Sequence, residues 1–241
     1  MNAIETKKLT KRYGDLTAVR DLDLTIRQGE LYALLGVNGA GKSTTIKMLS
    51  CLSRPTSGDA WLLGRSILSD SAAVKKLISV SPQETAVAPN LSVRENLELM
   101  AGIYGEARRA QRATEVMEQL GLGEAANRRA KVLSGGWQRR LSIAMALISR
   151  PKILFLDEPT LGLDVLARRE LWAVIEGLKG SVTTILTTHY LEEAEALSDR
   201  VGIMAAGELR AVGTPEELKA LAGTSSFEDA FVALAGGKGA A

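Results

Sequence analysis

The chain has 241 residues, of which 46% are hydrophobic, and this is enough for one domain with a substantial buried core. Its 30 Lys and Arg residues against 28 Asp and Glu leave a formal net charge of +2, so the overall charge does not favour a nucleic-acid partner. Cys51 is the only cysteine, which excludes an intrachain disulfide. With no apolar run near the roughly 18 residues of a membrane span and no signal-peptide pattern at the start, we expect a soluble cytoplasmic protein.

The predicted elements begin with short strands over residues 3–35, where apolar and polar residues alternate. A capping-box pattern from Ser92 to Glu95 then opens the first helix of an all-helical insert at about 84–150. Strands alternate with helices elsewhere, which predicts a mostly parallel α/β core, and the Gly-rich residues 236–241 are predicted to be a disordered tail. Further strands are predicted at 58–63, 78–81, 153–156, 182–186 and 201–204, and helices at 42–52, 74–77, 93–104, 107–120, 134–149, 165–178 and 191–197.

A glycine-rich segment at 36–44 matches the phosphate-loop pattern G-x-x-x-x-G-K-[ST] in full. It follows the apolar run Leu31–Leu35, which is typical of a buried strand, and precedes a predicted helix. Consecutive N–H groups at such a turn surround a polyphosphate. Lys42 would reach the β- and γ-phosphates, and the Ser43 hydroxyl would complete the shell of a Mg²⁺ ion. The loop therefore predicts nucleoside triphosphate binding by Gly36, Asn38, Gly39, Gly41, Lys42, Ser43 and Thr44.

A second glycine-rich segment, Leu133–Gln138, precedes a long apolar-periodic run and reads as the exposed start of a helix. Ser134 can cap this helix, and Gly135 and Gly136 allow a ligand to approach the backbone. Its free N–H groups suit an anion. An ordinary capped helix is the better interpretation of Ser-Gly-Gly alone, but the phosphate loop in the same chain favours a phosphate contact.

Candidate catalytic residues follow three predicted strands, at the edge where ligands of open α/β sheets bind. Asp157 and Glu158 end the strand at 153–156; Asp157 is placed to hold Mg²⁺, and Glu158 to orient the attacking water as a general base. His189 ends another strand and would contact the γ-phosphate, while Gln83 follows a third and would meet Mg²⁺ or the water. The competing interpretations are an acidic turn for the carboxylates and a structural role for the lone histidine.

Two other features are interpreted as structural. Cys51 falls in the apolar helix predicted after the phosphate loop and is expected to be a small core residue. The pair Arg139–Arg140, like two other Arg pairs in the helical insert, is interpreted as part of a solvated helix face.

Essentially the whole chain resembles the ATPase subunits of ABC transporters, because its motifs occur in the order found there. These motifs are the phosphate loop, Gln83, Leu133–Gln138, Ile153–Glu158, Leu161–Asp164 and His189. The resemblance implies an α/β P-loop NTPase fold in one ABC ATPase domain at 1–235. Such a domain has a RecA-like core, an N-terminal antiparallel β-subdomain and a helical subdomain.

The resemblance also implies roles that the residues alone do not. Tyr13 would stack on adenine, and Asp164 would belong to a loop that couples two active sites. Two copies would close on two ATP molecules, each meeting one copy's phosphate loop and the other's Ser134–Gly136. The helical insert would dock on an integral membrane permease, placing the protein peripherally on the inner face of the cell membrane. In the family the fifth signature residue is usually Gln, whereas here it is Trp137, which would pack either under the loop or against the base.

Three further segments resemble the drug, lipid or polysaccharide exporter branch of prokaryotic ABC ATPases; these are Leu91–Leu97, Thr187–Ala194 and Gly213–Leu218. The chain also ends without the extra regulatory domain of many sugar importers, so export is favoured. The alternatives are an importer ATPase for amino acids or similar solutes, and a soluble ABC ATPase of the iron–sulfur assembly type.

Overall fold

The computed structural model describes residues 1–236, so the predicted tail lies, apart from Gly236, outside the described residues. The larger sheet is parallel except for its last strand, β11, which pairs antiparallel with β10. Its two central strands, β4 and β9, are buried along their whole length, as expected for parallel strands covered on both faces. The strand order is β11 (Glu208–Gly213), β10 (Arg200–Ala205), β4 (Leu31–Leu35), β9 (Thr183–Thr188), β8 (Ile153–Asp157) and β7 (Ile78–Ser81).

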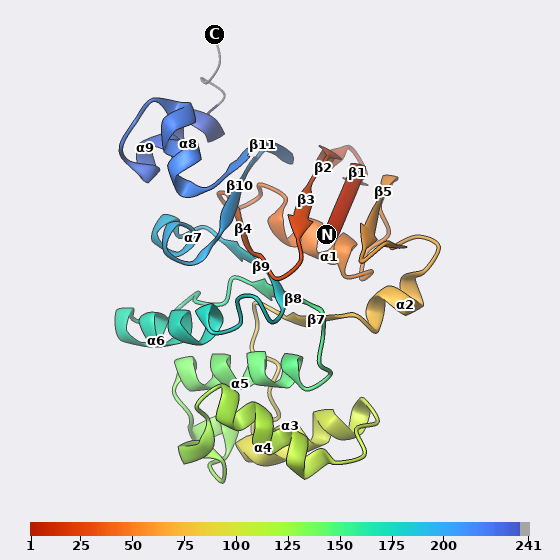
Figure 1. Cartoon of the computed structure of the whole chain (residues 1–241), viewed down its shortest axis with the longest axis vertical. Coiled ribbons are helices and arrows are strands. Elements are labelled where there is room, and N and C mark those ends of the chain that lie inside the picture. Colours follow the sequence, from red (N-terminus) through yellow and green to blue (C-terminus); the bar gives the residue numbers. More distant parts are fainter. Residues whose placement is uncertain (237–241) are drawn as a thin grey trace.

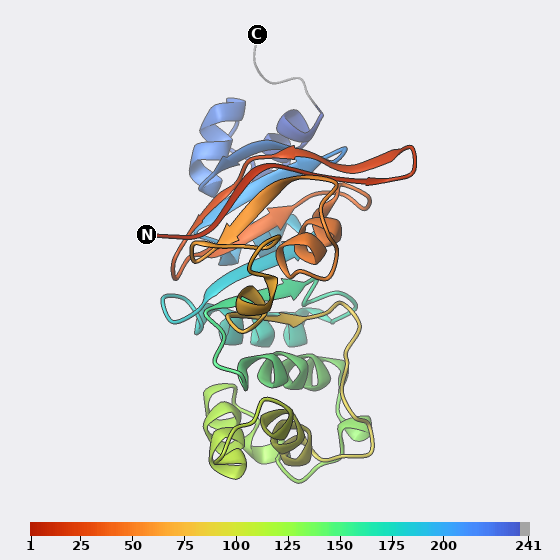
Figure 2. The same ribbon diagram turned by 90° about the vertical axis from the view of Figure 1, so that its right-hand side faces the viewer.

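A second, antiparallel sheet is built from the N-terminal strands and lies against the upper part of the parallel sheet (Figure 2). It is the N-terminal β-subdomain that the resemblance implies. Its first strand is a single long one with several register shifts, where short strands were predicted. The strands are β1 (Asn2–Tyr13), β2 (Leu16–Leu22), β3 (Thr25–Arg27), β5 (Ser57–Leu62) and β6 (Arg65–Ser66).

The helices divide by position along the long axis of the molecule (Figures 1 and 2). At one end lie α3 (Val93–Ile103) and α4 (Arg109–Gln119), and at the other α8 (Pro215–Ala222) and α9 (Phe227–Ala235). Helix α5 (Gly135–Leu147) packs against α3 and α4 on one side and against β7, β8 and α6 on the other. The remaining helices are α1 (Lys42–Leu49), α2 (Ser71–Lys75), α6 (Val165–Glu176) and α7 (Leu191–Leu197), with short 3₁₀ turns at Gly123–Ala125 and Ala130–Val132.

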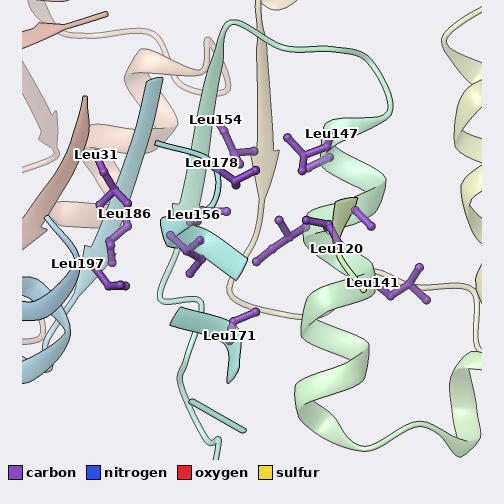
Figure 3. Packing of buried hydrophobic residues seen from close by; sticks show 14 of the residues in the cluster. Leu31, Leu120, Leu141, Leu147, Leu154, Leu156, Leu171, Leu178, Leu186 and Leu197 are labelled. Atoms are coloured by element: carbon purple, nitrogen blue, oxygen red, sulfur yellow. The ribbon is translucent and has the colours of Figure 1, made fainter. Parts of the chain in front are cut away.

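One continuous hydrophobic cluster joins the parallel sheet to the helical insert (Figure 3). Leu154 and Leu156 of β8 meet Leu171 of α6, and α5 contributes Leu141 and Leu147. Burying each such leucine stabilises the fold by roughly 1.5–3 kcal/mol. Helix α5, which begins at the second glycine-rich segment, therefore packs against the sheet that carries the first.

Most predicted elements are present with ends shifted by one or two residues, and three regions differ more clearly. Helix α1 ends at Leu49 because Cys51 adopts a left-handed conformation (φ 58°), which leaves Cys51 half-buried outside the helix and Leu52 69% exposed. Helix α2 begins at Ser71, three residues before the predicted helix. The segments that form α8 and α9 were not predicted as helices, although Thr214 and Glu217 form a capping box and Pro215 occupies the first turn of α8.

No helix among the described residues is both long and apolar enough to cross a lipid bilayer.

Candidate functional site

The phosphate loop connects β4 to α1, and two of its glycines are required by the surrounding backbone. A Cβ at Gly36 would lie 2.4 Å from the carbonyl oxygen of Met204. Gly41 has φ +105°, and a Cβ there would lie 2.6 Å from the carbonyl oxygen of Ala18. A Cβ at Gly39, by contrast, would meet nothing within 4 Å. The loop is thus packed closely on its inner side and open at its tip.

Lys42 lies inside the loop with only 4% of its surface exposed. Its Nζ donates to the carbonyl oxygens of Gly36 (2.7 Å) and Val37 (3.3 Å) and lies 3.6 Å from Oε1 of Glu158. Burial lowers the pKa of Lys42, and the charge of Glu158 opposes that shift. The Lys42 ammonium group therefore lies between the carbonyl oxygens of the phosphate loop and the carboxylate of Glu158.

Ser43 and Asp157 come together although they are far apart in the chain. The Ser43 hydroxyl donates to Oδ1 of Asp157 at 3.0 Å, and Thr187 of β9 donates to the same oxygen at 2.6 Å. Hydroxyl and carboxylate oxygens are the ligands that Mg²⁺ takes in proteins, usually with water and substrate phosphates completing the shell. The donor set therefore fits the predicted magnesium site. Gln83 and Ser43 line one cavity.

Glu158 is held in a left-handed backbone conformation (φ 47°), which is strained for a residue with a side chain. Its N–H donates to the carbonyl and to the hydroxyl oxygen of Thr187, at 3.2 and 3.0 Å. Its carboxylate Oε2 lies 3.1 Å from Nδ1 of His189. The ends of β8 and β9 thus place Glu158, the predicted general base, next to His189, the predicted γ-phosphate contact.

A cavity of about 760 Å³ collects most of the predicted site residues. Tyr13, 48% exposed, lines it at the end of β1, and the Nζ of Lys11 lies 5.0 Å from its ring centroid. Gly36 and Asp157 do not line the cavity but contact residues that do. The other predicted residues that line it are Asn38, Gly39, Gly41, Lys42, Ser43, Thr44, Gln83, Glu158 and His189.

Ser134, Gly135 and Gly136 stand apart from this cavity. The Ser134 hydroxyl accepts from the N–H of Trp137 at 3.4 Å, so the predicted helix cap is present at an exposed position. A Cβ at Gly136 would lie 3.0 Å from that of Ala167 in α6, which explains a glycine there. The predicted phosphate contact of Ser134–Gly136 is therefore not to the nucleotide of the same chain in this conformation.

Trp137 packs within its own subunit. Its side chain lies against the main hydrophobic cluster, with the Arg140 guanidinium 5.1 Å from its ring centroid. Arg140 in turn pairs with Glu170 of α6 at 3.1 Å. The side-chain amide of Gln138, the next residue, donates to the carbonyl oxygens of Ala130 and Leu133 at 3.1 and 3.2 Å. Gln138 is therefore also engaged in contacts within its own chain.

Arg139 was predicted to be solvated, and this was wrong. It is 5% exposed, and its guanidinium donates to the carbonyl oxygens of Pro82, at 2.6 Å, and Gln83. The available signal was its position on the face of α5 that carries the buried Ser142 and Ile143, although its charge argues against burial. Thr187, which orients both Asp157 and Glu158, was missed because threonine is common in buried strands.

Comparison with known proteins agrees with this geometry. Residues 19–161, more than half of the chain, match the model of a family described as ABC transporter. The chain belongs to the ABC transporter family. It is an ATP-binding ATPase subunit of that family, and the α/β P-loop fold predicted from the resemblance is confirmed.

This ABC ATPase is similar to several known proteins, among them two relatives and one solved structure. It is 44% identical over 226 residues to the daunorubicin/doxorubicin resistance ATP-binding protein DrrA of Streptomyces peucetius, covering 92% of the chain and 68% of DrrA. It is 40% identical over 239 residues to the probable multidrug ABC transporter ATP-binding protein YbhF of Escherichia coli, covering 96% of the chain but only 41% of YbhF. The dimeric, post-hydrolysis structure of the ATP-binding cassette MJ0796 with ADP and Pi superposes with a TM-score of 0.76 at 28% identity, covering 88% of the chain and 98% of MJ0796.

Proposed function

We propose that this chain binds and hydrolyses ATP to power an exporter, as a dimer docked on a membrane permease. The observation that carries the proposal is the meeting of the Lys42, Ser43–Asp157 and Glu158–His189 contacts at one cavity. Export is supported by the similarity to the daunorubicin/doxorubicin resistance protein DrrA and to the probable multidrug transporter protein YbhF. The permease would select the transported substrate.

The phosphates of ATP would lie against the open tip of the loop, where consecutive N–H groups and the start of α1 favour negative charge. Lys42 would turn its Nζ from the carbonyls of Gly36 and Val37 toward the β- and γ-phosphates. Ser43, Asp157 and Gln83 would hold Mg²⁺, which neutralises charge on the phosphates when bound. Tyr13 would stack on the adenine ring at the other end of the cavity.

Glu158 would orient the attacking water and accept its proton, because its carboxylate lies at the cavity and is buried. His189, 3.1 Å from that carboxylate, would hold it in place and contact the γ-phosphate. The strained backbone of Glu158 supports this role, since such conformations are retained where the site requires them.

The exposed start of α5 supports a composite site. Ser134 lies outside its own chain's cavity, and MJ0796, 28% identical to this chain, was solved as a dimer with ADP and Pi. In the proposed dimer Ser134–Gly136 of each copy would meet the nucleotide of the other. ATP would then stabilise the closed dimer, and hydrolysis would release it.

The helical insert with α3 and α4 would dock on the permease and place the protein at the inner face of the membrane. Membrane fractionation of the native host, followed by purification of the tagged chain, tests this. We expect a multi-span membrane protein to co-purify with it. Recovery of the chain with soluble partners alone would contradict the exporter proposal.

A further inference from the structure

Glu193 is a fully buried acid close to the catalytic residues but outside the nucleotide cavity. It lies in α7, four residues after His189, and is 0% exposed. Its Oε1 accepts a hydrogen bond from Nε1 of Trp172 in α6 at 3.1 Å. Within residues 1–236 it forms no ion pair. A buried carboxyl without a paired cation needs an explanation, because burial of an unpaired charge is costly.

The second carboxyl oxygen of Glu193, Oε2, is buried and lacks a hydrogen-bond partner in the described part of the chain. The same holds for Oγ1 of Thr160. Burial raises the pKa of Glu193, while the hydroxyls of Thr188 and Thr160, the Trp172 indole and the charge of Arg168 lower it. Burial has the largest effect, so the neutral acid is favoured. A neutral carboxyl has both a donor and an acceptor, which the surrounding hydroxyls and indole can satisfy together.

The groups around Glu193 belong to three functional segments. Thr188 immediately precedes His189. Thr160 lies in the turn that follows Glu158, where the N–H of Leu161 donates to the Glu158 carbonyl at 3.2 Å. Trp172 lies in α6, which the Asp164 side chain caps through the N–H of Ala167 at 2.9 Å. The Glu193 carboxyl therefore lies beside Thr188, which precedes His189, and beside Thr160 in the turn after Glu158, and it is hydrogen-bonded to Trp172 of the helix that Asp164 caps.

We propose that Glu193 is a positioning residue for ATP hydrolysis that holds His189 and the 158–164 segment in fixed relation. It does not line the nucleotide cavity and would act through the 3.1 Å contact between His189 and Glu158. A small displacement of either residue misaligns the base, and misplacement of about 1 Å can cost on the order of a hundredfold in rate. The inference rests on the ATPase activity of the chain.

Three variants separate this role from a packing role. Glu193→Ala removes the carboxyl, Glu193→Gln keeps a neutral donor and acceptor of the same shape, and Glu192→Gln changes an exposed acid on the same helix. We expect Glu193→Ala to lower kcat by roughly ten- to a hundredfold with nucleotide affinity unchanged. Glu193→Gln should restore kcat to within about twofold of wild type, and Glu192→Gln should leave it unchanged.

His189 offers a second readout that does not depend on turnover, because it is the only histidine in the chain. In protein without a polyhistidine tag, its imidazole NMR signals report the Glu158 contact directly. We expect Glu193→Ala to shift or broaden these signals, whereas Glu193→Gln and Glu192→Gln should leave them as in wild type.

Wild-type kcat and unchanged His189 signals in folded Glu193→Ala protein would overturn the inference. Should that variant fail to fold, Thr160→Val removes only the hydroxyl, and it too should lower kcat and shift the His189 signals. Unchanged kcat and signals in folded Thr160→Val protein would likewise overturn it. Inactive but folded Glu193→Gln protein would show that the ionised acid is needed and refute the neutral form. Absence of ATP hydrolysis in the wild-type chain would instead contradict the proposed function, and the NMR comparison would still decide the positioning role.

Discussion

Arg139 of α5 donates a hydrogen bond to the main-chain carbonyl of Gln83. This contact ties the helix that begins at Ser134 to the loop that carries Gln83 at the nucleotide cavity. In the proposed dimer Ser134 meets the partner's nucleotide, while Gln83 meets that of its own chain. Within one subunit, Arg139 therefore links the two segments that would contribute to the two halves of the proposed composite site.

Arg139→Met should destabilise the protein by about 1–3 kcal/mol, because the carbonyl oxygens of Pro82 and Gln83 lose their charged donor. Urea unfolding followed by circular dichroism measures this loss. Arg169→Gln, an exposed change on α6, is the matched control and should stay within about 0.5 kcal/mol of wild type. Equal stability of the two variants would show that the Arg139 contacts contribute little.

Glu158→Gln should keep ATP binding and lower turnover by at least about a hundredfold, since the amide cannot accept the proton of the attacking water. With hydrolysis blocked, ATP should hold two copies together. Gel filtration with ATP and Mg²⁺ should therefore show a dimer, and the same sample with ADP a monomer. A monomer under both conditions would count against the proposed mechanism.

Ser134→Arg should block hydrolysis while leaving the ATP affinity of the monomer nearly unchanged. The reason is that Ser134 does not line its own chain's cavity, so a bulky cation there obstructs only the partner's nucleotide. Equilibrium binding of a fluorescent ATP analogue at dilute protein, beside a steady-state ATPase assay, measures both quantities. Equal loss of binding and turnover would mean that Ser134 acts within its own chain.

Trp137→Gln, which inserts the residue usual for the family, should lower stability by roughly 1–3 kcal/mol without raising ATPase activity. The new side chain loses the packing of the indole against the hydrophobic cluster and its contact with Arg140. Thermal unfolding and an ATPase assay on the same samples provide the comparison. A more active variant would imply that Trp137 occupies a position meant for a nucleotide contact.

Stability should depend on pH through Glu193, because burial raises the pKa of its carboxyl above the ordinary value of 4.5. The unfolded chain releases this proton at a lower pH than the native chain does, so the stability contributed by the neutral acid is lost as pH rises through the folded pKa. Glu193→Gln lacks this titration. The free energy of unfolding of Glu193→Gln minus that of wild type should therefore increase with pH, by at most about 1.4 kcal/mol per unit. Urea unfolding of both proteins from about pH 4.5 upward tests this, and a constant difference would contradict it.

The sequence by itself determined the features that depend on neighbouring residues. The phosphate loop, the Ser92–Glu95 capping box, the Ser134 cap and strand β7 all lie where their local patterns predict. Because carboxyl ends of parallel strands share one edge, the meeting of Gln83, Glu158 and His189 at one cavity also followed from strand order.

Only the tertiary structure decided which polar side chains are buried and which segments they join. Arg139 reaches Gln83 across 56 residues of chain, and Glu193 reaches Trp172 of a neighbouring helix. Neither contact leaves a local pattern, because a charged residue on a helix is equally compatible with solvent until packing brings its partners to it. For the same reason the side to which Trp137 turns, left open by its position in the signature, was settled by the contact between α5 and the hydrophobic cluster.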